Sequence, residues 1–285
     1  MKFDGRALAH TLYEKLKRTV DDSFARTNIR PNVDVFLVGD NPSSISFIKQ
    51  KRIAAEKIGA TLTLHQSSDI SFKDFEKEIQ KSNINHDVHG IVIQRPLPEK
   101  RNDLTPLLQT IAVEKDVDGF LPHSPFEVPV AEGVLEILKE ISLTCHVPSV
   151  KDFLKNKTIV VIGRGVTAGT PITRIIAKHG VITPIVIHSQ TENPKSIMIS
   201  ADILISCVGQ THTVTKDSVK NGVILIGVGL SRNEEGTYSG DYDEKEIEER
   251  ASWYTPTPGG VGPVNVACLM KNLVISYTQS IGGTV

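Results

Sequence analysis

Short runs of uninterrupted apolar residues, alternating with helical patterns, constrain the fold of this chain more than any other feature. The clearest runs lie within the segments 33–39 (VDVFLVG), 89–94 (HGIVIQ), 157–163 (KTIVVIG) and 222–229 (GVILIGVG). A strand that is apolar at successive positions is covered on both faces, as strands are in parallel sheets. The repeated β-α-β order therefore predicts an α/β protein with a doubly wound fold.

The alternation is interrupted near the middle of the chain. Residues 142–150 (SLTCHVPSV) contain polar residues and a proline, and the strand pattern restarts at 157. We therefore expect two α/β lobes with a hinge near 142–155. Helices are expected at 43–58, 72–82, 104–112, 131–141 and 169–180, and in the apolar run 266–277.

Composition and charge argue against several classes of protein. The chain has 285 residues and a formal net charge of −1, with no basic face and no run of like charge, so we expect no nucleic-acid partner. No apolar run approaches membrane-spanning length, and the N-terminus lacks the apolar region of a signal peptide. Cys145, Cys207 and Cys268 lie in or near apolar segments without metal-binding spacing. We expect reduced core cysteines in a cytoplasmic protein with no membrane partner.

A glycine-rich segment of the second lobe, VVIGRGVTAGTP, follows a predicted strand and opens a predicted helix. Gly163, Gly165 and Gly169 have the spacing G-x-G-x-x-x-G, one residue longer than the usual dinucleotide fingerprint. The N–H groups and the dipole at such a helix start can hold a pyrophosphate. The alternative is a glycine-rich turn that binds no ligand.

The residues after the next strand favour one nucleotide over the other. An NAD site carries Asp or Glu about twenty residues on, where it binds the ribose 2′-hydroxyl. Here the strand ends in HSQT with no acid before Glu192, while Arg164 directly follows the first glycine. A guanidinium and hydroxyl groups suit a 2′-phosphate, so the sequence favours NADP over NAD.

Three segments of the first lobe carry candidate residues for chemistry. Phe47 and Lys51 are four residues apart on one helical face, although a helical lysine is usually a solvated charge. Gln94 ends a predicted strand, where open α/β sheets bind ligands. Asp116 and Asp118, in EKDVDGF, are either plain loop acids or include one that binds a donor-rich ligand.

A loop near the C-terminus combines proline and glycine in the sequence PTPGGVGPVN. Proline fixes φ and glycine permits close backbone approach, so such a loop is stiff and sterically bare. It can bring main-chain N–H and C=O groups against a ligand. The alternative is a tight turn before the last helix.

Taken in order, these motifs resemble a known family over nearly the whole chain. They are VGDNPSS, the F-x-x-x-K helix, VHGIVIQRPLP, EKDVDGF, VVIGRGVTAGTP, HSQT, DILISCVGQ, GVGLSR, SGDYD and TPTPGGVGPVNVACLM. The chain resembles the bifunctional methylenetetrahydrofolate dehydrogenase/methenyltetrahydrofolate cyclohydrolases. The resemblance implies a folate-binding catalytic domain at 1–142 plus 263–285, to which the last helix returns. It implies a Rossmann-like NADP domain at 143–262.

The resemblance also implies a reaction and its residues. NADP⁺ would take a hydride from 5,10-methylenetetrahydrofolate, and the methenyl product would be hydrolysed to 10-formyltetrahydrofolate. Lys51 would exchange the proton, Gln94 would orient Lys51, and Asp118 would bind the pterin. The remaining substrate positions are Phe47, Pro258, Gly259 and Gly262, and the cofactor positions are Gly163, Arg164, Gly165, Ser189 and Leu230. A homodimer formed through the nucleotide lobes and a place in one-carbon metabolism and purine biosynthesis are also implied.

Several positions depart from the family pattern. Phe47 stands for the usual tyrosine, Gly165 lacks a hydroxyl that would lie near the 2′-phosphate, and Gly227 lacks the usual acid. The linker after Phe120 is shorter and lacks the common PCTP, and Asn265 replaces a threonine while keeping capping ability.

These departures leave alternatives open. One is a dehydrogenase with weak or absent cyclohydrolase activity, because Phe47 lacks the tyrosine hydroxyl. Another is a folate- or nucleotide-binding homologue with impaired catalysis, which the retention of Lys51, Gln94 and Asp118 argues against. A third is a two-lobed NADP dehydrogenase acting on a hydroxy or amino acid, which gives no reason for the PGGVGP loop.

Overall fold

A computed structural model describes residues 1–180, 182–232 and 238–283, without the side chains of 99–104 and 232. Its contacts divide the chain into two compact units. The three-stranded unit contains His10–Pro129 and Val266–Val285, and the five-stranded unit contains Met1–Ala9 and Val130–Asn265. Helix α1 (Gly5–Thr27) begins in the five-stranded unit and continues in the other, and helix α9 (Val261–Ser280) is shared in the same way.

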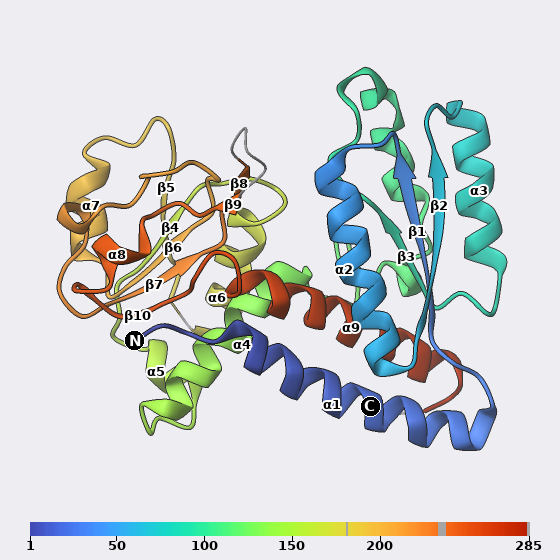
Figure 1. Ribbon diagram of the computed structural model, residues 1–285, viewed down its shortest axis with the longest axis horizontal. Helices are drawn as coiled ribbons and strands as arrows, with labels where there is room; N and C mark the ends of the chain where they lie inside the picture. The colour runs from blue at the N-terminus through green and yellow to red at the C-terminus, as the bar shows by residue number, and fades with distance from the viewer. Residues whose placement is uncertain (181, 233–237, 284–285) are drawn as a thin grey trace. The chain divides into compact units, whose positions relative to one another are not determined.

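The three-stranded unit is built on one parallel sheet in the order β2-β1-β3 (Figure 1). Central β1 is buried at every position after Asn32, and β3 is buried throughout, as the continuous apolar runs predict. The elements of this unit are β1 (Asn32–Val38), α2 (Pro42–Ile58), β2 (Thr61–Ser67), α3 (Phe72–Ile84), β3 (Gly90–Ile93) and the 3₁₀ helices η1 (Glu99–Thr110) and η2 (Val113–Lys115).

The start of helix α2 is fixed by its sequence. The Asn41 side chain accepts hydrogen bonds from the N–H groups of Ser43 and Ser44 at 2.9 and 3.1 Å, and Pro42 occupies the first turn. Such a cap satisfies N–H groups that have no partner inside the helix. The helix ends at Gly59, whose φ of +76° is left-handed. Both ends are therefore anchored, which sets the direction of the face carrying Phe47 and Lys51.

The five-stranded unit has a second all-parallel sheet, in the order β10-β7-β6-β4-β5. Strands β4, β6 and β7 are buried at every position, so the predicted α/β fold with strands covered on both faces is confirmed. The elements are α4 (Pro129–Thr144), α5 (Val150–Leu154), β4 (Ile159–Ile162), α6 (Gly169–Gly180), β5 (Ile185–Ile187), α7 (Pro194–Ser200), β6 (Ile203–Ser206), η3 (Lys216–Ser218), β7 (Val223–Gly227), β8 (Ser231–Arg232), β9 (Tyr238–Ser239), α8 (Glu244–Ile247) and β10 (Ala251–Tyr254).

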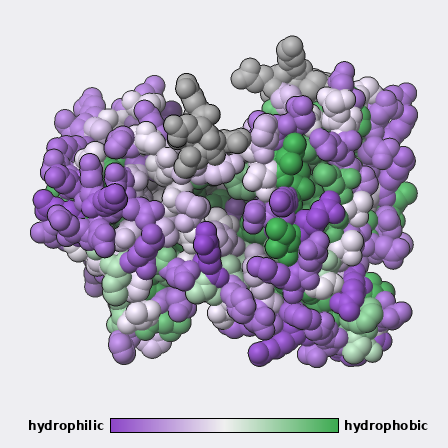
Figure 2. Space-filling model, viewed as in Figure 1, coloured by the Kyte–Doolittle hydropathy of each residue, from purple (hydrophilic) through white to green (hydrophobic). Residues whose placement is uncertain are grey.

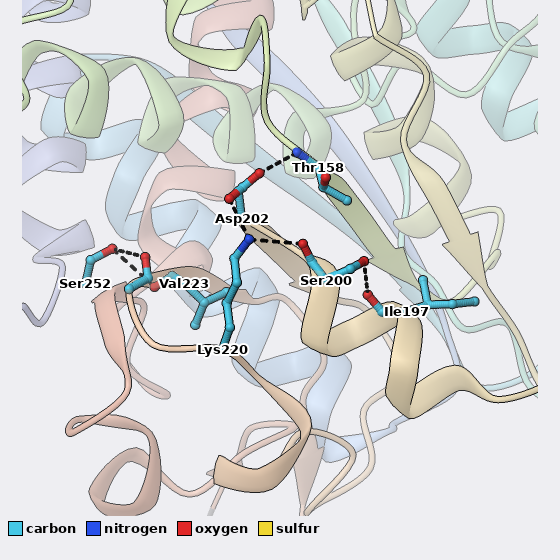
Figure 3. A network of polar contacts seen from close by, with 8 residues as sticks. Thr158, Ile197, Ser200, Asp202, Lys220, Val223 and Ser252 are labelled. Carbon is cyan, nitrogen blue, oxygen red and sulfur yellow. Dashed lines mark hydrogen bonds and ion pairs between the residues drawn. The ribbon is translucent and has the colours of Figure 1, made fainter.

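A polar network ties together the amino ends of the strands in this sheet (Figure 3). The carboxylate of Asp202 accepts from Thr158 N–H at 2.7 Å and from Lys220 Nζ at 2.7 Å. Burial alone would raise the pKa of Asp202, but these two donors outweigh it and lower that pKa. Open α/β sheets bind their ligands at the opposite, carboxyl ends of the strands.

The C-terminal part of helix α9 packs in the three-stranded unit, as expected from the sequence. The Asn272 side-chain amide donates to the carbonyls of Val117 and Glu127 at 2.9 and 3.0 Å. Tyr277 is fully buried and donates its hydroxyl to the Ile29 carbonyl at 2.7 Å. Within the described residues, no helix combines the length and the apolar character needed to cross a membrane.

Some sequence expectations were wrong in detail. The segment expected as a helix at 104–112 is part of a 3₁₀ helix, Glu99–Thr110, which has Pro106 inside it. Proline removes a backbone donor and so disfavours a regular α-helix. Helix α4 runs to Thr144, so the expected hinge begins inside a helix. Cys145, just beyond it, is exposed rather than in the core. Cys207 is half-buried, Cys268 is buried, and none of the three forms a disulfide.

Candidate functional site

A lysine from helix α2 meets a glutamine that directly follows strand β3. Lys51 Nζ donates to Gln94 Oε1 at 3.0 Å. The other end of the Gln94 amide donates through Nε2 to the Arg95 carbonyl at 2.7 Å, and Gln94 N–H donates to the Phe36 carbonyl at 2.9 Å. Because its amide is held at both ends, Gln94 presents a fixed oxygen to the lysine. The structure thus brings together two of the sequence-predicted site residues.

The environment of Lys51 favours its neutral form. Burial lowers the pKa of its amine below the ordinary 10.5, and the carboxylate of Asp118 partly offsets this effect. The neutral oxygen of Gln94 accepts a hydrogen bond but adds no charge to hold the ammonium form. An amine in this state can take up and release a proton closer to neutral pH than a solvated lysine.

Two aspartates in EKDVDGF differ in their surroundings: Asp116 holds its own turn, whereas Asp118 can accept hydrogen bonds from a ligand. Asp116 is buried; its side chain accepts from Leu121 N–H at 2.9 Å and its carbonyl from Gly119 N–H at 2.9 Å. Burial raises the pKa of Asp116, and the hydrogen bond from Leu121 N–H to its carboxylate offsets this in part. Asp118 is half-buried, and its carboxylate makes no hydrogen bond or ion pair with the described residues. A ligand with N–H donors would therefore find an unoccupied acceptor at Asp118.

The exposed side of helix α2 is apolar beside the lysine. Phe47, one turn before Lys51, is exposed, as are Ile45 and Ile53. Figure 2 shows apolar side chains gathered over this helix. The Phe47 ring is thus available to stack on a flat ligand near the Lys51 amine.

The glycine turn before helix α6 has the shape of a phosphate cradle. Gly163 has a φ of +103°, and a Cβ added to Gly169 would lie 2.1 Å from the Gly163 carbonyl oxygen. Only glycine permits this close approach of backbone. A Cβ added to Gly165 would meet nothing within 4 Å, so the turn opens at that point. The free space and the helix start fit the pyrophosphate of a dinucleotide.

The other predicted cofactor residues lie at the carboxyl ends of strands in the same sheet. Arg164 follows β4, Ser189 follows β5 and Leu230 follows β7, and all three side chains are exposed. Within the part of the chain that is described, the Arg164 guanidinium has no ion pair or hydrogen bond. It is therefore available for a phosphate.

Sequence reasoning missed a buried acid that shapes this edge. Asp241 is fully buried and accepts from Ser206 Oγ at 2.6 Å, Val208 N–H at 3.1 Å and Gln210 N–H at 2.9 Å. It thereby fixes the loop after β6. The motif SGDYD contained this residue, but the motif alone gave no indication of its partners.

Gly227, which stands where the family usually has an acid, has no space beside it for a side chain. A Cβ at Gly227 would lie 2.9 Å from the ring of Tyr242. The Tyr242 hydroxyl donates to the Thr255 carbonyl, and Gly227 N–H donates to Thr255 Oγ1 at 2.8 Å. The Tyr242 ring therefore occupies the space that a side chain at 227 would need.

The proline–glycine loop is supported from behind by the start of α1. A Cβ at Gly5 would lie 1.9 Å from the carbonyl oxygen of Gly260, so only glycine fits at position 5. Gly259 has a φ of +114°, and Gly260 N–H donates to the Pro256 carbonyl at 2.8 Å. This packing makes the loop stiff, as its composition predicts.

A charged side chain fixes the residue before Pro258. Glu244 accepts from Thr257 N–H at 2.9 Å and forms an ion pair with Lys2 at 2.8 Å. A Cβ at Gly262 would meet nothing within 4 Å. Pro258, Gly259 and Gly262 belong to the five-stranded unit, whereas Lys51, Gln94, Asp118 and Phe47 belong to the three-stranded unit.

Comparison with known proteins accounts for nearly the whole chain. The catalytic domain of tetrahydrofolate dehydrogenase/cyclohydrolase matches residues 3–118, and the NAD(P)-binding domain of the same family matches residues 129–281. The bifunctional protein FolD of Nautilia profundicola is 35% identical over 281 residues, covering 95% of both chains.

Two solved structures share the architecture. The bifunctional methylenetetrahydrofolate dehydrogenase/cyclohydrolase FolD of Campylobacter jejuni is 32% identical, with a TM-score of 0.88 over 98% of this chain and 99% of that one. The Trypanosoma brucei enzyme, solved with NADP cofactor and an inhibitor, is 28% identical, with a TM-score of 0.89 over 99% and 98%. Two matched domains and a relative 35% identical along both chains show that this chain belongs to the tetrahydrofolate dehydrogenase/cyclohydrolase family.

Proposed function

We propose that this protein oxidises 5,10-methylenetetrahydrofolate to 5,10-methenyltetrahydrofolate with NADP⁺ and hydrolyses the product to 10-formyltetrahydrofolate. The observation that carries the proposal is the Lys51–Gln94 hydrogen bond of 3.0 Å, on a lysine with a lowered pKa, in a chain that matches both family domains. The reactions belong to one-carbon metabolism.

The five-stranded unit would hold the cofactor. The turn of Gly163 and Gly165, with the N-terminus of α6, offers N–H groups to the pyrophosphate, and Arg164 and Ser189 offer donors to the 2′-phosphate. Leu230, which follows β7, offers an exposed apolar side chain at the carboxyl edge of the same sheet. NADP⁺, when bound, supplies the acceptor for the hydride.

Lys51 carries the hydrolytic step. Its neutral amine takes a proton at Nζ from the attacking water, as the water oxygen forms its bond to the one-carbon unit. The same proton then passes to the ring nitrogen whose bond to that carbon breaks, and the remaining hydroxyl proton of the adduct is released to solvent as the formyl C=O forms. Gln94 keeps Nζ in position throughout, and the cationic substrate further disfavours the ammonium form of Lys51.

The family resemblance assigns the folate-binding residues one by one. Asp118 accepts hydrogen bonds from the amino group and ring nitrogen of the pterin, and Phe47 stacks on its flat surface. Pro258, Gly259 and Gly262 bring bare backbone to the substrate. The domains 1–142 plus 263–285 and 143–262 remain our proposal for the functional limits; residues 1–9, 130–142 and 263–265 of the first lie in the five-stranded unit.

Phe47 raises the alternative of a dehydrogenase without useful hydrolysis. The contact that positions the Lys51 amine comes from Gln94 and needs no hydroxyl at residue 47. This contact supports the retention of both activities. We also propose a cytoplasmic homodimer, formed through the nucleotide-binding lobes, that supplies formyl groups for purine biosynthesis.

Two assays on the purified protein test the proposal. In the first, 5,10-methylenetetrahydrofolate and NADP⁺ should give the methenyl product. In the second, 5,10-methenyltetrahydrofolate without nucleotide should lose its absorbance as it is hydrolysed. Accumulation of methenyl product without hydrolysis would establish the monofunctional alternative. Absence of both reactions would contradict the proposed function.

A further inference from the structure

An arginine that no assigned role uses lies beside the Lys51–Gln94 pair. Arg95 directly follows Gln94 at the carboxyl end of β3, and its carbonyl accepts the hydrogen bond from Gln94 Nε2 at 2.7 Å. The Arg95 guanidinium carbon lies 4.2 Å from the centre of the Phe120 ring. Phe120 comes two residues after Asp118, so this contact joins the segment of Gln94 to that of Asp118.

The guanidinium contacts an aromatic ring but has no acidic partner among the side chains that the structure describes. Arg95 is half-buried, and the described residues give it no carboxylate within ion-pair distance. The turn that carries Phe120 is itself held by Asp116, which accepts from Leu121 N–H at 2.9 Å. A guanidinium that contacts a ring through its face keeps its edge N–H groups free. Those groups match the two oxygens of a carboxylate.

The proposed substrate carries such a group at the end remote from the pterin. Tetrahydrofolate continues from the pterin through an aminobenzoyl group to one or more glutamates, whose carboxylates are its negative charges. Asp118 is assigned to the donor-rich pterin, and an acid there cannot take the anionic tail. Arg95 is a cation in this neighbourhood with no acidic partner of its own among the described residues.

We propose that Arg95, supported by the Phe120 ring, binds a carboxylate of the glutamate tail of the substrate. The inference rests on the proposed function and extends it, because it makes Arg95 a determinant of specificity for glutamylated over tail-less pterins. A charge-assisted hydrogen bond contributes about 1.5–3 kcal/mol, which corresponds to roughly 10- to 100-fold in affinity.

The test compares two ligands that differ only in the tail. Dissociation constants are measured by calorimetry for tetrahydrofolate and for tetrahydropteroate, which lacks the glutamate, on the full-length protein. The wild type should bind tetrahydrofolate roughly 10- to 100-fold more tightly. In Arg95→Leu the ratio of the dissociation constants, tetrahydropteroate to tetrahydrofolate, should fall close to one. In Arg95→Lys, which keeps the charge but loses the planar guanidinium, the ratio should be intermediate.

The chain offers a matched control in the same unit. Arg30 also lies over a phenylalanine, with its guanidinium carbon 3.9 Å from the centre of the Phe24 ring, but it precedes the amino end of β1. Arg30→Leu should therefore keep the wild-type ratio. An equal loss of affinity for both ligands in Arg95→Leu would overturn the inference, because Arg95 would then only position Gln94 and Asp118.

Measuring the two folate reactions alongside the affinities distinguishes failure of this inference from failure of the proposed function. If the ratio behaves as expected but neither folate reaction occurs, the tail site stands and the proposed function fails. If both reactions occur but Arg95→Leu keeps the wild-type ratio, the inference fails alone. If the wild type binds neither ligand, both are overturned.

Discussion

Both units contain a parallel sheet, but different kinds of residue lie at the carboxyl edges of the two sheets. At the carboxyl edge of the three-stranded sheet, side chains with titratable or polar groups, Lys51, Gln94 and Asp118, lie close together. At the carboxyl edge of the five-stranded sheet, the prominent residues are glycines, which leave the backbone bare: Gly163, Gly165 and Gly169. Proton transfer needs a group with a suitable pKa, whereas a pyrophosphate needs backbone N–H groups at close range.

This difference predicts two kinds of failure. A substitution in the three-stranded unit should abolish a chemical function while the fold survives. A substitution in the glycine turn should act through steric conflict and change stability and nucleotide affinity together. The following variants test the contrast, from the largest expected effect to the smallest.

Gly169→Ala should have the largest effect on stability. Its Cβ would lie 2.1 Å from the Gly163 carbonyl oxygen, so the turn and the start of α6 must separate. We expect the free energy of unfolding to fall by about 3 kcal/mol, measured by urea denaturation, and NADP⁺ affinity to fall with it. Gly165→Ala is the matched control for stability, because its Cβ would meet nothing within 4 Å and should change the unfolding free energy by about 0.5 kcal/mol or less. Equal stability of the two variants would contradict the steric account.

Arg164→Ala should separate the two nucleotides. Loss of a charge-assisted contact to the 2′-phosphate would lower the affinity for NADP⁺ by roughly 10- to 100-fold and leave the affinity for NAD⁺ nearly unchanged. Dissociation constants for both nucleotides, measured by titration calorimetry, provide the test. Equal losses of affinity for NADP⁺ and NAD⁺ would show that Arg164 does not bind the 2′-phosphate.

Asp118→Asn should shift the pH dependence of hydrolysis by a modest amount. Hydrolysis needs neutral Lys51, so its rate should rise with pH through the pKa of that amine. Burial lowers this pKa and the Asp118 carboxylate raises it, so removing the carboxylate should lower the pKa further. The rising limb of kcat against pH should therefore move to lower pH. A shift to higher pH would show that Asp118 does not act on Lys51 in this way.

The sequence predicted the parts of the fold that depend on local pattern. Continuous apolar runs identified buried parallel strands such as β4 and β7, because burial on both faces leaves no polar alternation. Strand β10 was missed because ASWY is short, lies at the edge of its sheet and exposes Ser252. The 3₁₀ helix η1 was expected as a regular α-helix because apolar spacing does not distinguish the two.

The sites were predictable to different degrees. The glycine spacing indicated the nucleotide turn directly, but Lys51 on its pattern alone was an ordinary helical lysine, and the family resemblance supplied its role. Arg95 and Asp241 were missed because their importance lies in contacts with residues 25 and 35 positions away in the chain. Such contacts follow from the packing of the chain, which no local motif contains.

In the proposed function, proton transfer depends on Lys51 and cofactor binding depends on the five-stranded unit. The most direct test is the rate at which Lys51→Met hydrolyses 5,10-methenyltetrahydrofolate without nucleotide, with Lys49→Met, an exposed lysine on the same helix, as the control. We predict a loss of about 10²- to 10⁴-fold for Lys51→Met, with wild-type affinity for NADP⁺ and little change in the control. Hydrolysis by Lys51→Met at the wild-type rate would contradict the claim.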